Sequence, residues 1–521
     1  MITNLVEYFE NNVVKNNALK TAVIDRDEQY SFAFIREHAK KIASYILSSN
    51  IDTYNKPVGV FLEKSVDVVI SNIAAMYSCM PYMNMDIKTP IMRISNIIEQ
   101  VDPVFIITNS QYEPKIKEIY NGNIINIENF DYNIEIDNQK IQARQKMHID
   151  TNPLCIINTS GSTGVPKSVV LNHRSFFDFM DWAFETMPFT ENEVIGSLSP
   201  IVFDIYSFEL CLMLSNASTI VLIPDGLSTF PIKILNLLEK NKITYLFWVP
   251  TIMVNIANMD LLNKVDLSSL KLIWFAGEVF PTKQLNIWRK ELPNVMFVNM
   301  YGPIEITLDC TYFIVNREFN DNEPLPIGYP CRNTDILILD GDQLAKDGED
   351  GELCVRGTSL AMGYYNNPEK TQVAFMQNPL NRYYPEIIYR TGDIVCKNKN
   401  GEIMFKGRKD TLIKHLGYRI ELGEIEHIIV SVLKIVKNAC VMYDKVKKEI
   451  VCVYENESEI SMADFRKKIG DALPKYMLPT KYIHTENMPR NTNGKIDRQL
   501  LKEIYIQTVK ENKSKQSFRG G

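Results

Sequence analysis

Short apolar runs, rich in β-branched and aromatic residues, alternate with helix-like patterns from about residue 20 to about residue 300. "PVGVFL" precedes the helix-like "SVDVVISNIAAMY", and later runs read "PVFIITN", "PLCIINTS", "TIVLIP", "TYLFWVP", "KLIWFAG" and "VMFVNMYG". The intervals between these runs suit intervening helices, which is typical of layered α/β units with largely parallel strands. The sequence therefore predicts an α/β fold for this part of the chain.

The sequence pattern changes twice after this region. Beyond about residue 325, "TDILILD", "GELCVRG" and "GEIMFKGR" read as short strands with glycine-containing turns, so a β-rich subdomain is expected. Past "GRKDTLI", the pattern is helix, strand, strand, helix, strand, which suits a small α+β domain. Because 521 residues exceed what one hydrophobic core serves, we predict an N-terminal core domain over 1–408, joined by a hinge to a small C-terminal lid domain over 409–507, and a flexible tail over 508–521.

Charge and hydropathy exclude several classes of protein. The 57 basic and 63 acidic residues give a net charge of −6, which disfavours a nucleic-acid or anionic-membrane surface. The first residues, "MITNLVEYFENN", are acidic where a signal peptide would be basic. Every early apolar stretch falls short of about 18 uninterrupted apolar residues. We expect a soluble, cytoplasmic protein that binds no nucleic acid and does not insert into a membrane.

Cysteine and histidine are placed without a metal-binding pattern. The nine cysteines are scattered and never spaced as CxxC, so buried reduced thiols are expected. The six histidines form no HxxxH or HExxH pair, which argues against a zinc site built by the protein.

The stretch "TSGSTGVPK" has the composition of a loop that wraps an anion. A Walker A loop has its lysine directly after the second glycine, whereas two residues intervene here, so that pattern fails. Glycines still let the backbone approach phosphate oxygens, and hydroxyls can donate to them; a flexible surface turn is the alternative. The phosphate-binding candidates are Thr159, Ser160, Gly161, Ser162, Thr163, Gly164 and Lys167.

Further stretches follow this loop in a fixed order. They read "FDIYSFEL" (203–210), "AGE" (276–278), "NMYGPIEIT" (299–307), "GELCVRG" (351–357), "YRTGDIV" (389–395), "GRKDTLIKHLGYRIELGEIE" (407–426) and "NGKIDR" (493–498). Each stretch alone is weak evidence of a family. In this order, however, the set of stretches resembles the motifs of the adenylate-forming superfamily, which comprises acyl-CoA ligases, luciferases and adenylation domains of non-ribosomal peptide synthetases. The stretches "FAGEVFP" and "LPIGYP" are also similar to sequences of D-alanine:carrier-protein ligases.

The resemblance implies a two-step reaction with ATP and Mg²⁺ as cofactors. A substrate carboxylate attacks the α-phosphate of ATP to give an acyl-adenylate and pyrophosphate, and the acyl group then passes to a thiol. Negative charge builds on the α-phosphate while a second anion approaches it, so cations and fixed donors must offset both.

The resemblance also assigns roles to single residues. Lys495 matches the lysine that bridges the substrate carboxylate and ATP, and Lys167 assists the departing pyrophosphate. Glu305 matches the magnesium ligand, whose hard oxygen suits that ion. Asp410 matches the hinge about which the small domain turns between the two steps.

The expected nucleotide site gathers residues from several of these stretches. Asp393 matches the aspartate that accepts from the ribose hydroxyls, and Arg408 an arginine near the ribose. Tyr301 would stack on adenine. The other expected members are Ala276, Gly277, Glu278, Asn299 and Gly302.

Asp204 indicates what kind of carboxylate is activated. It falls where amino-acid-activating members bind the α-ammonium group, and acyl ligases do not need a buried charge there. A helix-start aspartate that caps its own backbone is the alternative. The other expected pocket residues are Ile205, Phe208, Thr251, Trp274, Ala276, Met300, Leu308 and Asp309.

The pocket residues leave two kinds of amino acid open. Phe208, Trp274 and Met300 are bulky and predict a short pocket, while Asp309 adds a second carboxylate. A small polar amino acid, serine- or alanine-like, or a compact basic one would fit. The chain ends soon after Lys495, so we expect a free-standing amino acid:[carrier protein] ligase that loads a separate phosphopantetheinyl carrier protein. An acyl- or aryl-CoA ligase and a catalytically silent homologue that acts as a binding protein are the alternatives.

Ile304 departs from the family pattern. Members usually carry a threonine between the proline and the glutamate, and its hydroxyl reaches the α-phosphate. A hydrogen bond to a charged group contributes about 1.5 to 3 kcal/mol, so we expect its loss to slow adenylation by roughly ten- to a hundred-fold without abolishing it.

We therefore expect Ile304→Thr to keep or raise the rate of adenylation, because it restores a donor to the charge that develops on the phosphate. The measurement is ATP-pyrophosphate exchange of both proteins. A large loss of exchange in the variant would contradict this expectation and would indicate that Ile304 has another role.

Overall fold

The computed structural model describes residues 2–159, 166–409, 412–490, 496–498 and 500–507. The chain divides into two compact units. The larger unit comprises Met1–Ile87, Ile97–Thr159 and Lys167–Asp410. The smaller unit contains Lys88–Asn96 and the chain from Thr411 onward.

The largest sheet among the described residues has nine strands in the order β15-β14-β13-β12-β11-β9-β10-β1-β2. The central strands from β13 to β1 are parallel to one another, and β14, β15 and β2 are antiparallel to their neighbours. Every residue of β10, β11 and β12 is buried, as expected for parallel strands covered on both faces. The bounds are β1 (Thr21–Asp25), β2 (Glu28–Ser31), β9 (Val194–Ser197), β10 (Thr219–Leu222), β11 (Tyr245–Trp248), β12 (Leu272–Phe275), β13 (Met296–Tyr301), β14 (Thr311–Ile314) and β15 (Tyr329–Pro330).

A second sheet of the larger unit has seven described strands in the order β19-β8-β7-β4-β3-β5-β6. Strands β7, β4, β3, β5 and β6 pair in parallel, whereas β8 is antiparallel to both β7 and β19. The bounds are β3 (Val58–Phe61), β4 (Tyr82–Asn84), β5 (Phe105–Thr108), β6 (Asn123–Asn126), β7 (Pro153–Thr159), β8 (Lys167–Asn172) and β19 (Gly363–Tyr364).

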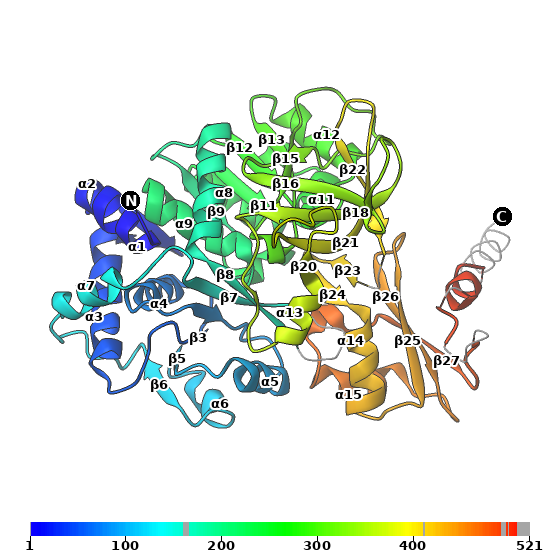
Figure 1. Cartoon of the computed structure of the whole chain (residues 1–521), viewed down its shortest axis with the longest axis horizontal. Helices are drawn as coiled ribbons and strands as arrows, with labels where there is room; N and C mark the ends of the chain where they lie inside the picture. The colour runs from blue at the N-terminus through cyan, green and yellow to red at the C-terminus, as the bar shows by residue number, and fades with distance from the viewer. Residues whose placement is uncertain (1, 160–165, 410–411, 491–495, 499, 508–521) are drawn as a thin grey trace. The chain divides into compact units, whose positions relative to one another are not determined.

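Helices fill the space around these two sheets (Figure 1). The helices α4 (Val66–Tyr77) and α9 (Asp204–Asn216) are buried along nearly their whole length, and one hydrophobic core joins them to both sheets. The other α-helices are α1 (Leu5–Tyr8), α2 (Lys15–Asn17), α3 (Phe32–Ser48), α5 (Ile91–Val101), α6 (Glu113–Lys117), α7 (Asn138–Lys146), α8 (His173–Thr186), α10 (Pro231–Lys240), α11 (Pro250–Asn258), α12 (Thr282–Glu291) and α13 (Pro368–Ala374). Short π or 3-10 turns are η1 (Phe9–Val14), η2 (Asp225–Thr229), η3 (Leu262–Lys264) and η4 (Ile304–Ile306).

The third sheet of the larger unit is antiparallel. Its order is β17-β16-β18-β21-β20, with β22 also paired to β21. A separate hydrophobic core beneath it includes Tyr301, the last residue of β13, and Ile306 and Cys310, which follow that strand. The bounds are β16 (Thr334–Asp340), β17 (Gln343–Leu344), β18 (Gly351–Gly357), β20 (Phe375–Gln377), β21 (Ile387–Lys397) and β22 (Ile403–Arg408).

The smaller unit has its own hydrophobic core. A hairpin of β23 (Leu412–His415) and β24 (Tyr418–Glu421) leads into α14 (Leu422–His427) and η5 (Ile428–Val432). A sheet in the order β25-β26-β27 follows, with β26 and β27 parallel. The remaining bounds are β25 (Asn438–Asp444), β26 (Glu449–Glu455), α15 (Met462–Gly470), η6 (Lys475–Met477) and β27 (Lys481–Thr485).

The architecture confirms the fold class predicted from the sequence: layered α/β units, a β-rich sheet after residue 325 and a small α+β unit at the C-terminal end. All nine cysteines are buried and none belongs to a disulfide, as expected for reduced thiols. In the part of the chain that the structure describes, no helix combines the length and apolar character that a membrane span requires.

Candidate active site

Four neighbouring parallel strands end at one edge of the nine-stranded sheet. Strands β13, β12, β11 and β9 lie side by side in that order and end at Tyr301, Phe275, Trp248 and Ser197. The residues that follow them, 302–309, 276–278, 249–251 and 198–204, include the expected site residues Gly302, Ala276, Thr251 and Asp204. Ligands of open α/β sheets bind at the carboxyl ends of the strands. The topology thus brings the expected substrate and nucleotide residues of the sheet to one edge.

Asp393 joins Tyr301 and Arg408. The Tyr301 hydroxyl donates to Asp393 Oδ2, and Arg408 Nη1 donates to Asp393 Oδ1 over 2.7 Å. Asp393 and Arg408 face each other across β21 and β22, and Tyr301 ends β13 in another sheet. Burial, together with the charge of Asp393, raises the pKa of the Tyr301 hydroxyl well above its ordinary value. Three residues that the sequence assigned to the nucleotide therefore form one hydrogen-bonded cluster.

Glu305 lies fully buried in η4, and two bonds reach it from the β19 region. The Tyr364 hydroxyl donates to Glu305 Oε1 over 2.9 Å, and the Ala361 amide donates to the Glu305 carbonyl over 2.9 Å. Sequence reasoning missed Tyr364, because "AMGYYNN" carries no residue pattern that indicates chemistry. Only the pairing of β19 with β8 places it beside the carboxylate.

The donor set at Glu305 fits a magnesium ion that arrives with ATP. In the described ranges, no group of three or more His, Cys, Asp or Glu side chains is placed to hold a metal ion by itself. Magnesium in nucleotide sites commonly takes one or two carboxylates and completes its shell with phosphate oxygens and water. A single buried carboxylate at the strand edge matches that need.

Lys167 opens β8 opposite Thr159, the last residue of β7. The Thr159 hydroxyl donates to the Lys167 carbonyl over 3.4 Å. The Lys167 ammonium lies 5.3 Å from the ring centroid of Tyr364, a cation–π distance. Both ends of the expected phosphate loop are thus fixed by a hairpin. The loop members Ser160, Gly161, Ser162, Thr163 and Gly164 lie outside the described residues, as do Lys495 and Asp410.

Several expected nucleotide residues bond to the protein's own groups. The carboxylate of Glu278 accepts from the Thr251 amide over 3.2 Å and from the Thr251 hydroxyl. Asn299 Nδ2 donates to the Pro326 carbonyl over 2.7 Å. Gly277 has φ of +92°, a backbone conformation that favours glycine. These bonds shape the ends of β11, β12 and β13 next to the site.

Asp204 is the first residue of α9, and its side chain is partly exposed. Its Oδ1 accepts from the adjacent Ile205 amide over 3.0 Å, and the N-cap position of α9 belongs to Phe203 and not to Asp204. A carboxylate has about four lone-pair sites, so this bond is compatible with a second role as acceptor for an ammonium group.

The expected pocket wall is packed with aromatic rings. Trp274 is fully buried, and Phe208 stacks on it with an interplanar angle of 8° and a centroid distance of 5.6 Å. Further rings surround the indole at 5.4 to 6.2 Å: Phe179, Trp182, Phe189, Tyr245 and Phe247. Other buried members of the wall are Ile205, Ala276, Met300 and Leu308.

The turn after β13 is tightly packed around Gly302. A Cβ on Gly302 would stand 2.3 Å from the Leu308 carbonyl oxygen and 2.5 Å from Asp309 Cα, so only glycine fits. Thr307 and Leu308 both adopt positive φ, which is unusual for such residues and turns the chain back onto Gly302. Asp309 is thereby held buried at 3% exposure.

Glu209 is another buried carboxyl, and sequence reasoning missed it. It lies on α9 and is fully buried. Burial raises its pKa from an ordinary 4.5 to about 7, and the positive charge of Lys64 limits the rise. The Lys64 ammonium donates to the carbonyls of Ser197 and Ser199, each over 2.7 Å. Lys64 and Glu209 thus flank the segment that leads from β9 to Asp204.

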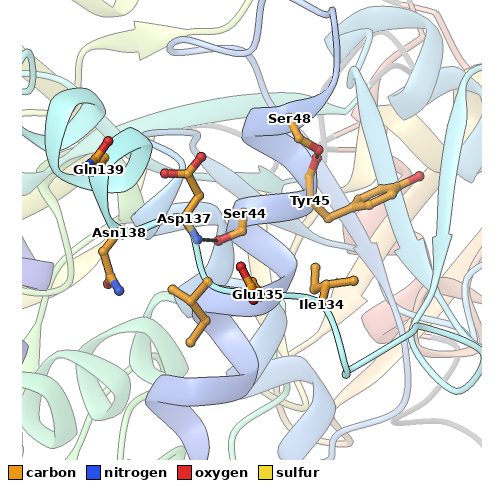
Figure 2. A pocket seen from close by; sticks show the side chains of 9 residues that line it. Ser44, Tyr45, Ser48, Ile134, Glu135, Asp137, Asn138 and Gln139 are labelled. Atoms are coloured by element: carbon orange, nitrogen blue, oxygen red, sulfur yellow. Dashed lines mark hydrogen bonds between the residues drawn. The ribbon is translucent and has the colours of Figure 1, made fainter.

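An open pocket of about 590 Å³ lies elsewhere in the larger unit. Figure 2 shows its lining of hydroxyl and acidic side chains from α3 and from the segment before α7, where the Asp137 amide donates to Ser44 Oγ over 2.9 Å. Its lining contains no residue of the stretches quoted above, so it is not the candidate active site.

The family model described as AMP-binding enzyme matches residues 9–365, more than half of the chain. The chain belongs to this family, within the adenylate-forming superfamily that its motifs resemble.

Relatives include several proteins named as synthases. The chain is 31% identical over 510 residues to gramicidin S synthase 1 of Brevibacillus brevis, covering 95% of the chain and 44% of that protein. It is 29% identical over 495 residues to tyrocidine synthase 1 of Brevibacillus parabrevis, covering 93% of the chain and 43% of that protein. Zwittermicin A synthase ZmaJ of Bacillus cereus is 28% identical over 511 residues, with 96% of the chain and 95% of that protein covered. The chain thus spans less than half the length of the first two.

Solved structures establish the same fold. Holo-PA1221, a non-ribosomal peptide synthetase protein with adenylation and PCP domains, matches with a TM-score of 0.81 and 21% identity, over 96% of this chain and 84% of that one. The o-succinylbenzoate CoA synthetase of Bacillus subtilis matches with a TM-score of 0.78 and 18% identity, over 96% and 98%. The Vibrio cholerae adenylation domain AlmE, in complex with glycyl-adenosine-5'-phosphate, matches with a TM-score of 0.78 and 19% identity, over 96% and 97%.

Glu209 predicts a pH dependence of stability. Folding raises the pKa of Glu209. Its contribution to the free energy of unfolding is therefore fully present below pH 4.5 and is lost as the pH rises to about 7. At about 1.4 kcal/mol per unit, the loss is on the order of 3 kcal/mol.

We expect the thermal unfolding midpoint to fall less between pH 5 and pH 8 for Glu209→Gln than for the wild type. The measurement is a series of melting curves at these pH values, with the exposed Glu318→Gln as matched control. Identical pH profiles for all three proteins would contradict the raised pKa.

Proposed function

We propose that the protein activates an amino acid with ATP as an aminoacyl-adenylate, releases pyrophosphate, and transfers the aminoacyl group to the phosphopantetheine thiol of a carrier protein. The observation that carries the proposal is Asp204, a carboxylate at the start of α9 beside the strand ends where the nucleotide residues gather. A negative side chain there suits the α-ammonium group of an amino acid and would repel a plain anionic acid.

The cluster around Asp393 supports the nucleotide part of the proposal. The Asp393 carboxylate on β21 is held by Tyr301, which ends β13, and by Arg408, and it can accept from ribose hydroxyls. Glu305 and Lys167 stand at the expected phosphate end, linked through Tyr364.

Three charged residues would manage the charge of the reaction. Glu305 would bind magnesium, which supplies positive charge to phosphate oxygens when it is bound with ATP. Lys495 would neutralise the substrate carboxylate as it approaches the α-phosphate. Lys167 would stabilise the charge of the departing pyrophosphate.

The aromatic wall favours a small side chain. Phe208 and Trp274 stack on each other and fill the region between α9 and β12, so the substrate side chain has little apolar depth to enter. A serine- or alanine-sized amino acid fits best. Asp309, buried at the turn, supports a compact basic amino acid as the second possibility, since a buried carboxylate favours a cationic neighbour.

A separate carrier protein is the proposed acceptor. Holo-PA1221, which shares the fold, contains adenylation and PCP domains in one chain. Rotation at Asp410 would withdraw Lys495 after the first step and allow the thiol to enter. The reaction would take place in the cytoplasm as part of non-ribosomal peptide synthesis or a related pathway.

Two other functions have some support. The fold shared with o-succinylbenzoate CoA synthetase supports an acyl- or aryl-CoA ligase, in which the acceptor thiol is coenzyme A. Ile304 supports a catalytically silent homologue that serves as a binding protein, because a family hydroxyl is missing next to Glu305.

The test is ATP-pyrophosphate exchange across the L- and D-amino acids and diamino acids, with wild type and Asp204→Ala. Removing one partner of a buried charge pair costs about 2 to 5 kcal/mol, so we expect exchange to fall by roughly 30-fold or more in the variant. Asp464→Ala, also an aspartate in the first turn of a helix, is the matched control and should leave exchange unchanged.

Each alternative gives a different result. Exchange that depends on fatty or aromatic acids and is indifferent to Asp204→Ala would indicate the CoA ligase. No exchange with any acid would indicate the silent homologue.

A further inference from the structure

Tyr364 is held firmly at the edge of the seven-stranded sheet. It lies on β19, paired with Val169 of β8, and only 5% of its surface is exposed. Its backbone amide donates to the Thr371 hydroxyl over 2.9 Å, which ties β19 to α13. The position of the ring is therefore set by strand pairing and by the start of a helix.

The side chain of Tyr364 touches two residues of opposite charge. Its hydroxyl donates to Glu305 Oε1 over 2.9 Å, across 59 residues of sequence. Its ring centroid lies 5.3 Å from the Lys167 ammonium. One tyrosine thus links the expected magnesium ligand to the expected phosphate lysine.

The two contacts fix the geometry without neutralising either charge. A tyrosine hydroxyl is a neutral donor, so it leaves the negative charge of Glu305 in place, whereas a lysine at this position would compensate that charge. The hydrogen bond restrains one carboxylate oxygen and so sets where the other lone pairs point. The ring face attracts the ammonium of Lys167 through its quadrupole, which orients the ammonium without removing its positive charge.

We propose that Tyr364 is a positioning residue that orients Glu305 and Lys167 for the metal-bound phosphates of ATP, an inference that rests on the proposed function. A purely structural hydrogen bond between η4 and β19 is the competing explanation. The two differ in one respect: a positioning residue acts on nucleotide binding only when the metal is present.

The experiment is calorimetric titration of the full-length protein with ATP, in buffer with Mg²⁺ and in buffer with EDTA. Tyr364→Phe removes the hydroxyl and keeps the ring over Lys167. Loss of a hydrogen bond to a charged group is expected to weaken binding about ten-fold with Mg²⁺ and to change binding less than two-fold in EDTA. Tyr364→Leu removes the ring as well and should weaken binding in both buffers.

Tyr365→Phe is the matched control, because the neighbouring tyrosine is partly exposed and its backbone amide pairs with Ser168. It should bind ATP like the wild type in both buffers. The thermal unfolding midpoint of each variant reports whether the fold is intact. In ATP-pyrophosphate exchange, Tyr364→Phe should raise the Mg²⁺ concentration for half-maximal rate several-fold more than it lowers kcat.

Equal weakening of Tyr364→Phe in both buffers, or no weakening, would overturn the proposal in favour of a structural bond. A wild type that binds ATP equally well with and without Mg²⁺ would overturn it too. A third result is also informative: Tyr364→Phe weakens the Mg²⁺-dependent binding of ATP, but no acid supports ATP-pyrophosphate exchange. This result would support Tyr364 as a positioning residue and would overturn only the proposed function.

Discussion

The turn between β13 and β14 is the constraint on which the rest of the site depends. Tyr301 at its start bonds to Asp393 of the antiparallel sheet, and Glu305 within it accepts from Tyr364 of the seven-stranded sheet. Positive φ at Thr307 and Leu308 folds the turn against Gly302, where a side chain would strike the backbone. Three sheets of the larger unit therefore meet at this short segment. The hydrogen bonds of Tyr301 and Glu305 offset the backbone strain at Thr307 and Leu308.

This junction brings residues that are far apart in sequence into contact. The nucleotide candidates come from the antiparallel sheet and from the ends of β12 and β13, and the phosphate candidates Thr159 and Lys167 come from the hairpin of β7 and β8. The substrate candidates come from α9 and the strand ends. No single element carries all of these side chains, so their placement depends on how the elements pack together. The aromatic packing around Trp274 gives this part of the expected pocket wall a fixed shape, which the proposed selection of a small amino acid would require.

Much of the fold and part of the site could be predicted from the sequence. Alternating apolar runs indicated the layered α/β order, because buried parallel strands are apolar throughout. The ordered motifs located Tyr301, Asp393 and Arg408, which the structure joins by hydrogen bonds. Tyr364 and Glu209 were missed, since a tyrosine or a glutamate in an apolar context has no pattern of its own. The contacts of Tyr364 and the raised pKa of Glu209 depend on tertiary neighbours, and these follow from strand pairing and helix burial.

The most direct test of the account is a crystal structure with a non-hydrolysable aminoacyl-adenylate analogue, the sulfamoyl adenosine of the amino acid that best supports exchange. The account predicts the ribose hydroxyls at Asp393, the adenine against Tyr301 and the ammonium group at Asp204. The side chain of the ligand should end against Phe208 and Trp274. An analogue bound with its ammonium group away from Asp204, or with its ribose away from Asp393, would contradict the account.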